Sequence, residues 1–77
     1  MIKVIVKNNV NENEIIVDEN SSIKDVLDNE GVDYTTRMIA LNGETIRIED
    51  LTKSFKDFTL KEYNYLMAMK RLDNASF

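Results

Sequence analysis

The chain has 77 residues and contains neither cysteine nor histidine, which excludes disulfide bonds, thiol and imidazole catalysis and nearly all zinc or copper sites. With 43% hydrophobic and 31% charged residues, the composition is typical of a folded protein, and we expect one domain over residues 1–77, ending in a short polar tail at 73–77. The net charge of −4 argues against nucleic acid binding. No apolar run could span a bilayer and the N-terminus lacks a signal-peptide layout, so we expect a cytoplasmic protein that does not bind membranes.

The first part of the chain predicts a β-hairpin. The run "IKVIVK" at 2–7 alternates with a period of two and is rich in β-branched residues, as in a strand. Its two sides are Ile2, Val4 and Val6, and Lys3, Ile5 and Lys7. We expect a turn at "NNVNENE", residues 8–14, because asparagine tolerates left-handed backbone geometry. The run "IIVDE" at 15–19 then predicts a second strand, with Ile15 and Val17 facing the core.

A helix is expected from Ser22 to Glu30, where the apolar residues change to helical spacing. Ser22 and Asp25 resemble a capping box, with aspartate in place of glutamate. Gly31 stands where a helix takes a left-handed residue at its C-terminal end, and Val32 can fold back on the last turn.

The clearest hairpin signal is Asn42–Gly43 within "RMIALNGETIRI", because both turn residues tolerate a positive φ. Its apolar residues are Ile39 and Leu41 before the turn and Ile46 and Ile48 after it. A connector over 49–64 follows, with a short helical turn. We expect its buried anchors to be Leu51, Phe55, Phe58 and Leu60.

The last predicted strand, "YLMAMKRL" at 65–72, is apolar on both sides. One side carries Leu66, Ala68 and Leu72, and the other carries Tyr65, Met67, Met69 and Arg71. Periodicity alone therefore leaves open which side is buried. The full element order predicts an α+β fold, in which one helix covers one face of a mixed four- to five-stranded sheet of order ββαβ(β)β. Parallel strands are expected in the middle of this sheet, as in a β-grasp.

Over almost its whole length the chain resembles ubiquitin. The resemblance rests on the order of a Met-start first strand, "SSIKDVLDNEGV" as the helix, "IALNG" as a strand and turn, and "SFKDFTLKEYNYLMAMKRL" leading to a final Arg-Leu. "IALNGE" is also similar to the small β-grasp sulfur carriers of thiamine and molybdopterin synthesis. The resemblance implies a ubiquitin-like β-grasp fold, and it places Leu66 and Ala68 in the core.

The two families end in Gly-Gly, whose carboxylate is adenylated by an activating enzyme. At the matching place, after Arg71 and Leu72, this chain has Asp73, Asn74 and Ala75. We therefore expect a ubiquitin-like protein that is not conjugated. The alternative is a covalent modifier or a sulfur-carrier relative that is activated by a separate adenylating enzyme.

No catalytic, cofactor-binding or metal-binding residues are expected. The neighbouring carboxylates Glu49 and Asp50 could suggest acid–base chemistry, but such pairs are usually solvated turns, and a small β-grasp lacks a pocket to shift their pKa values. Two further acidic pairs, Asp18 with Glu19 and Asp28 with Glu30, lack the spacing of a calcium loop.

The remaining class of function is protein binding through the sheet face opposite the helix, where ubiquitin carries its interaction patch. If Leu66 and Ala68 are buried, that face shows an apolar set rimmed by basic residues: Ile5, Met38, Ala40, Met67 and Met69, with Lys3, Lys7 and Arg71. Methionine suits such a surface because its side chain repacks against varied partners. If the register is the other way, Met67 and Met69 are core residues.

We therefore expect an interaction module that binds another protein and that is a monomer or a weak homodimer. A further alternative is a small acidic inhibitor or nucleic acid mimic, whose acidic residues would cluster on one side: Asp18, Glu19, Asp25, Asp28 and Asp33.

Overall fold

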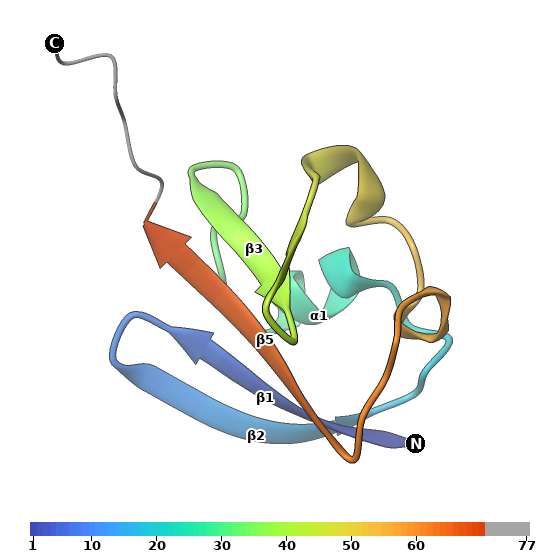
Figure 1. Ribbon diagram of the computed structural model, residues 1–77. Helices are drawn as coiled ribbons and strands as arrows, with labels where there is room; N and C mark the ends of the chain where they lie inside the picture. Colours follow the sequence, from blue (N-terminus) through green and yellow to red (C-terminus); the bar gives the residue numbers. More distant parts are fainter. Residues whose placement is uncertain (71–77) are drawn as a thin grey trace, which may run out of the picture.

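The computed structural model describes residues 1–70, which form a five-stranded sheet with one helix packed across it (Figure 1). The strands are β1 (Ile2–Asn8), β2 (Asn11–Val17), β3 (Arg37–Leu41), β4 (Glu44–Ile46) and β5 (Tyr63–Lys70). The helix is α1 (Ile23–Asn29), and two 3-10 helices, η1 (Ile48–Asp50) and η2 (Phe55–Asp57), lie in the connector before β5. The predicted strand end at 71–72 and the predicted tail at 73–77 lie outside the described residues.

The strands are ordered β2-β1-β5-β3-β4 across the sheet. The central pair, β1 and β5, is parallel, and the other three pairs are antiparallel. This arrangement confirms the predicted α+β class, the element order and the parallel strands in the middle of a mixed sheet. β1 and β5 come from opposite ends of the described chain, so their pairing brings these two ends together in the middle of the sheet.

The first hairpin has a tighter turn than the sequence predicted. Asn9 and Val10 alone form the turn, with Asn9 at a φ of 58°, and Asn8 pairs directly with Asn11. The prediction of a turn over 8–14 was therefore wrong for Asn8, which ends β1, and for residues 11–14, which belong to β2. β2 is an edge strand whose first four residues are exposed and pair with β1 through their backbone, while Ile15 and Val17 pack against the core as predicted.

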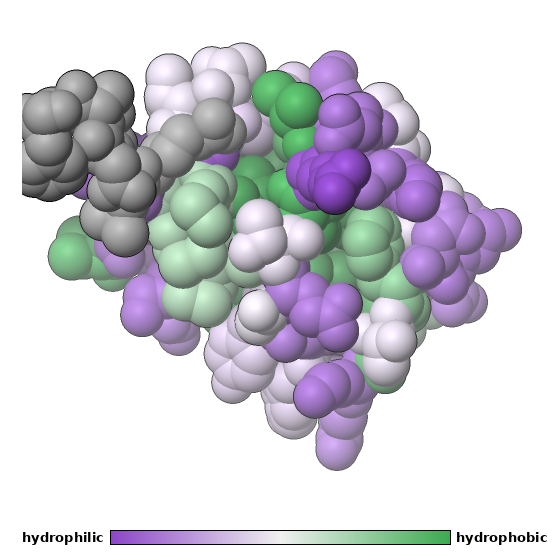
Figure 2. Space-filling model, turned by 45° about the horizontal axis from the view of Figure 1, so that its top comes forward, coloured by the Kyte–Doolittle hydropathy of each residue, from purple (hydrophilic) through white to green (hydrophobic). Residues whose placement is uncertain are grey.

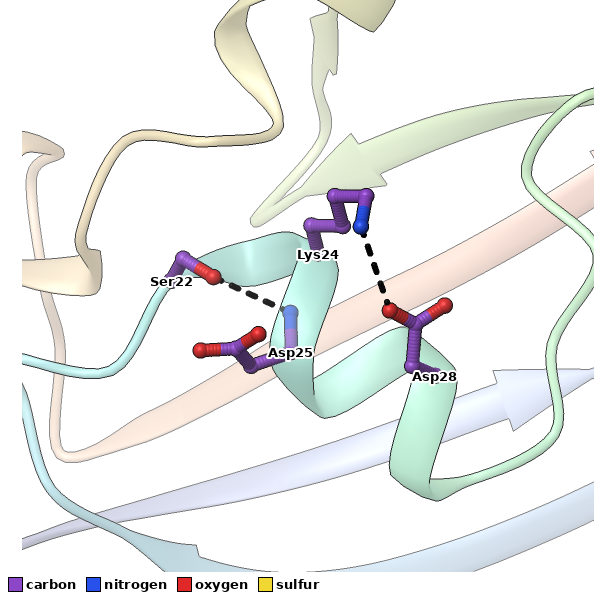
Figure 3. Close-up of polar contacts among 4 residues, drawn as sticks. All are labelled: Ser22, Lys24, Asp25 and Asp28. Atoms are coloured by element: carbon purple, nitrogen blue, oxygen red, sulfur yellow. Dashed lines mark hydrogen bonds and ion pairs between the residues drawn. The ribbon is translucent and has the colours of Figure 1, made fainter.

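The helix forms where it was predicted, and side-chain interactions support it (Figure 3). Ser22 Oγ accepts a hydrogen bond of 3.0 Å from the backbone N–H of Asp25, which caps the first turn. Within the described residues, only this half of the predicted capping box forms at α1. One turn further on, Lys24 Nζ lies 3.5 Å from Asp28 Oδ2 on the exposed side of the helix.

The C-terminal end of α1 is closed by the left-handed residue that was predicted. Gly31 has a φ of 69°, and its N–H donates to the carbonyl of Asp28 at 3.2 Å. The N–H of Val32 donates to the carbonyl of Leu27 at 2.9 Å, and both side chains are buried. These two hydrogen bonds make a Schellman motif, which satisfies two carbonyl groups of the last turn of the helix.

The second hairpin turns at Asn42 and Gly43, with φ values of 53° and 87°. This confirms the expected Asn-Gly turn. β4 ends at Ile46, which is buried, so the predicted continuation of the strand to Ile48 was wrong. Ile48 begins η1 and is 54% exposed, because the chain leaves the sheet there.

The core lies between α1 and the face of the sheet that α1 covers. Leu51 and Phe55 of the connector are buried in it, as predicted, while Phe58 and Leu60 are half-buried at its margin. β5 begins at Tyr63, two residues before the predicted start, because its pairing with β1 extends to Lys3. The buried strand residues include Val4, Val6, Ile39, Leu41, Leu66 and Ala68.

Candidate protein-interaction surface

The burial of β5 decides which side chains lie on the uncovered face of the sheet. Leu66 and Ala68 face the helix and are buried, so the alternate residues of β5 point the other way. Strand register then places residues of β1 and β3 beside them: Ile5 opposite Tyr65, Met38 opposite Met69, and Ala40 opposite Met67. We call this surface the open face; its residues are Lys3, Ile5, Lys7, Met38, Ala40, Tyr63, Tyr65, Met67 and Met69.

The predicted apolar set lies together on the open face, although its members differ in exposure. Ile5, Met38, Met67 and Met69 are half-buried and reach solvent. Ala40 is only 3% exposed, so the prediction that it is displayed was wrong. Its cross-strand neighbours, Met67 on β5 and Thr45 on β4, have longer side chains than its methyl group. Ala40 therefore forms the floor of the surface.

The basic rim is placed by β1. Lys3 and Lys7 are exposed and alternate with Ile5 on the open face. Lys3 Nζ lies 5.2 Å from the centroid of the Tyr63 ring, within the range of a cation–π contact. Arg71, the third predicted basic residue, lies outside the described residues.

Two tyrosines belong to the open face and were missing from the predicted set. Tyr63 and Tyr65 are 43% and 47% exposed, and they continue the line of Met67 and Met69 along β5. The alternation of β5 already grouped Tyr65 with the methionines, and that signal could have identified it. Tyr63 was assigned to the connector because the strand was expected to start later.

The open face is hollowed beside the second hairpin. A shallow depression of about 360 Å³ has a largely apolar lining, with Lys61 as its one charged lining residue. It is lined by Asn42, Gly43, Lys61, Tyr63, Tyr65 and Met67. In a view turned toward the top of the molecule, hydrophobic atoms gather near the middle and are broken by neutral and hydrophilic ones (Figure 2). The surface is thus mixed in character, with an apolar part that polar groups interrupt.

Hydrogen bonds of the buried Asn64 and of Asn42 connect the backbone segments beside this depression. Asn64 is fully buried, and its Oδ1 accepts hydrogen bonds from Lys61 N at 2.9 Å and Asn42 Nδ2 at 3.0 Å. Its Nδ2 donates to the carbonyls of Lys3 and Lys61, at 3.1 and 3.0 Å. Asn42 Oδ1 in turn accepts from Tyr65 N at 2.9 Å. The network fixes the backbone on which Lys61 and Tyr65 are displayed, and no local pattern in the sequence marks Asn64 as buried.

No protein-family model matches the sequence, and a search of curated proteins finds no match. Solved structures do match along nearly the whole chain. A ubiquitin-like protein from Trypanosoma brucei has 16% identity and a TM-score of 0.71, over 92% of this chain and 95% of that one. The ubiquitin-like domain of yeast Ddi1 has 21% identity and a TM-score of 0.67, over 95% and 92% of the two chains.

A ubiquitin-like protein from the hyperthermophilic archaeon Caldiarchaeum subterraneum matches at 12% identity and a TM-score of 0.56, over 95% of this chain and all of that one. The chain has the ubiquitin-like β-grasp fold. At these identities the similarity establishes the architecture alone.

In this ubiquitin-like fold, register with β1 places Glu12 and Glu14 of β2 at the edge of the open face. Three of the predicted acidic residues have partners elsewhere. Asp18 Oδ1 accepts from Asn20 N at 2.8 Å, and this hydrogen bond lowers the pKa of Asp18. The Thr35 and Thr36 hydroxyls donate to the carboxylate of Asp33 at 2.6 and 2.9 Å, and they lower its pKa.

The third partnered carboxylate is Asp28, whose charge raises the pKa of Lys24, with a smaller effect from the Tyr34 hydroxyl. Asp25 lies on the first turn of α1, and Glu19 lies in the connection from β2. Within residues 1–70, no group of three or more acidic residues is placed to hold a metal ion.

The pair Glu49 and Asp50, weighed as an acid–base candidate, lies in η1. Asp50 Oδ1 is 3.5 Å from Lys53 Nζ, so its charge has a local partner. No helix in the described part of the chain is long and apolar enough to cross a membrane.

Proposed function

We propose that this ubiquitin-like chain is a protein-interaction module that docks on another protein through its open face, without conjugation and without catalysis of its own. The observation that carries the proposal is the alternation of β5. Leu66 and Ala68 are buried under the helix, while Met67, Met69 and Tyr65 remain accessible on the opposite side. An apolar surface exposed to water is costly to keep, and its contact with a partner would remove that cost.

The residue types on the open face are those of a protein-binding surface rather than those of a sheet face that only meets solvent. Tyrosine supplies a large rigid contact area with few rotatable bonds, and it is enriched among residues that dominate binding energy. Three half-buried methionines continue this surface: Met67 and Met69 follow the tyrosines along β5, and Met38 of β3 lies opposite Met69. Their flexible side chains can adjust to the shape of a partner. The surrounding lysines would form a polar rim.

The proposal can be tested by native capture with face-directed variants. Met67→Asp and Ile5→Asp each place a charge on the open face, and Thr52→Asp places the same charge on an exposed connector residue outside the sheet. The N-terminally tagged proteins would be expressed in the native cell and captured from lysate, after circular dichroism has shown that all are folded. We expect specific partners to be lost from Met67→Asp and Ile5→Asp and retained by Thr52→Asp.

A parallel capture under denaturing conditions separates binding from conjugation. We expect a single species of unmodified mass, with partners lost in denaturant. Heavier adducts that survive denaturant would instead show a transferable modifier. Folded Met67→Asp and Ile5→Asp variants that retain every partner would overturn docking through the open face. Fractionation of the same cells would test the cytoplasmic location, which is part of the proposal.

A further inference from the structure

The depression beside the second hairpin differs from the rest of the open face in carrying aromatic rings next to amines. Tyr63, Tyr65 and Met67 supply its apolar wall, and Lys61 stands at its margin. Lys3 lies over the Tyr63 ring from the neighbouring strand. Met69 follows Met67 on the same face of β5, so an occupant can extend beyond the depression in the strand direction.

The two amines have no close carboxylate partner. Within residues 1–70, the ion pairs closer than 4.0 Å are Lys24–Asp28 and Lys53–Asp50, and neither involves Lys3 or Lys61. Glu62 lines a neighbouring depression together with both amines, and Glu44 lines another with Lys61, but neither carboxylate lines this one. Two amines outnumber the one carboxylate that lies with both of them, so the site is locally positive on a chain whose net charge is −4.

The backbone beneath the hollow is already organised. The N–H groups of Lys61 and Tyr65 are both bound by asparagine side chains, Asn64 Oδ1 and Asn42 Oδ1. Neither backbone segment would need to order on binding, which lowers the entropic cost of occupying the site.

We propose that the depression receives one aromatic side chain of a partner peptide, and that carboxylates flanking this side chain bind Lys61 and Lys3. This inference rests on the proposed function and adds the chemistry of the partner: an acidic segment with an apolar anchor. The anchor would stack on Tyr65 and Met67, while the flanking carboxylates would neutralise the two amines.

Synthetic peptides provide the probe. The first has one phenylalanine with two glutamates on each side; the second has glutamines in place of the glutamates; the third has alanine in place of the phenylalanine. Each would be titrated into the ¹⁵N-labelled protein while amide shifts are followed. We expect the acidic phenylalanine peptide to shift the amides of Gly43, Tyr65 and Met67, and to bind at least about fivefold more tightly than either analogue.

Charge variants test the role of the amines. Lys61→Glu is expected to weaken binding of the acidic phenylalanine peptide by about tenfold. Lys56→Glu makes the same change of charge on an exposed residue of η2 and is expected to leave binding within about twofold. Raising the salt concentration should weaken the wild-type complex and bring it closer to the Lys61→Glu complex.

Each other outcome has a definite meaning. Equal binding of the glutamate and glutamine peptides would overturn the acidic partner and leave docking through the open face intact. Shifts confined to Met38 and Met69 would overturn the location of the anchor. No shift at millimolar peptide would overturn the inference, whereas the proposed function would still be decided by the capture with Met67→Asp and Ile5→Asp.

Discussion

Asn42 Nδ2 donates a hydrogen bond of 3.0 Å to Asn64 Oδ1 and so joins the turn of the second hairpin to the beginning of β5. The two residues are 22 positions apart, and both also bind backbone groups of the segment that carries Lys61 and Tyr65. Asn42 therefore has two roles, since it also adopts the positive φ of the turn. The network couples the stability of the hairpin to the shape of the candidate binding surface.

Replacement of Asn64 by alanine is expected to lower the free energy of unfolding by about 2–3 kcal/mol, because it leaves buried backbone groups without partners. Urea denaturation would measure the loss. The matched control is Asn13→Ala, an exposed asparagine whose amide donates one hydrogen bond to Glu30, with an expected change of about 0.5 kcal/mol or less. Equal effects of the two substitutions would show that the network adds no stability.

The two faces of β5 are expected to respond differently to truncation. Leu66→Ala removes a fully buried side chain from the core, and we expect a loss of about 2–5 kcal/mol. Met67→Ala removes a half-buried side chain from the open face, and we expect a loss of about 1 kcal/mol or less. Chemical denaturation of both variants would measure the difference. A larger loss for Met67→Ala than for Leu66→Ala would contradict the register of this strand.

Gly31 is expected to be sensitive to its backbone conformation rather than to space. A Cβ atom at this position would meet no heavy atom within 4 Å, but the φ of 69° is strained for residues with a side chain. Gly31→Ala should therefore cost about 1 kcal/mol. Gly31→Asn should cost less, because asparagine tolerates the left-handed region. Thermal unfolding of the two variants would test this order, and equal midpoints would contradict it.

Low pH is expected to destabilise the segment that follows α1, because the carboxylate of Asp33 becomes protonated. Thr35 and Thr36 bind its ionised carboxylate and lower its pKa from the ordinary value of 3.8. A lowered pKa in the folded state means that the stabilisation is complete above the ordinary pKa and is lost as the pH falls through the lowered one. Asp33→Asn should unfold at lower urea than the wild type at about pH 7, and the two midpoints should converge at about pH 2. A difference independent of pH would contradict a role for the charge.

Much of the fold was predictable because its signals are local. The Asn42–Gly43 turn, Gly31 after the helix and Ser22 before it depend on the conformational preferences of single residues, and the structure confirms all three. The errors arose where strand pairing overrides the preferences of single residues. β2 includes polar residues 11–14 because β1 supplies their hydrogen-bond partners, and Tyr63 joins β5 because it pairs with Lys3.

The candidate site was predictable in part. Alternation within β1 and β3 correctly placed Ile5 and Met38 on one face, but alternation cannot report how far a neighbour covers a side chain. Ala40 is therefore on the predicted face but inaccessible. Asn64 is a polar residue in a polar stretch, and its burial depends on carbonyl and amide groups from three separate segments.

The sequence by itself determined the alternation of β1 and β3, the position of the helix and its ends, and the sharp turn of the second hairpin. These follow from hydrophobic periods and backbone preferences that act over a few residues. Only the tertiary structure decided which apolar side of β5 is buried, because both sides have the same period and similar hydrophobicity. That choice is made by packing against α1, and it leaves Tyr65, Met67 and Met69 on the open face.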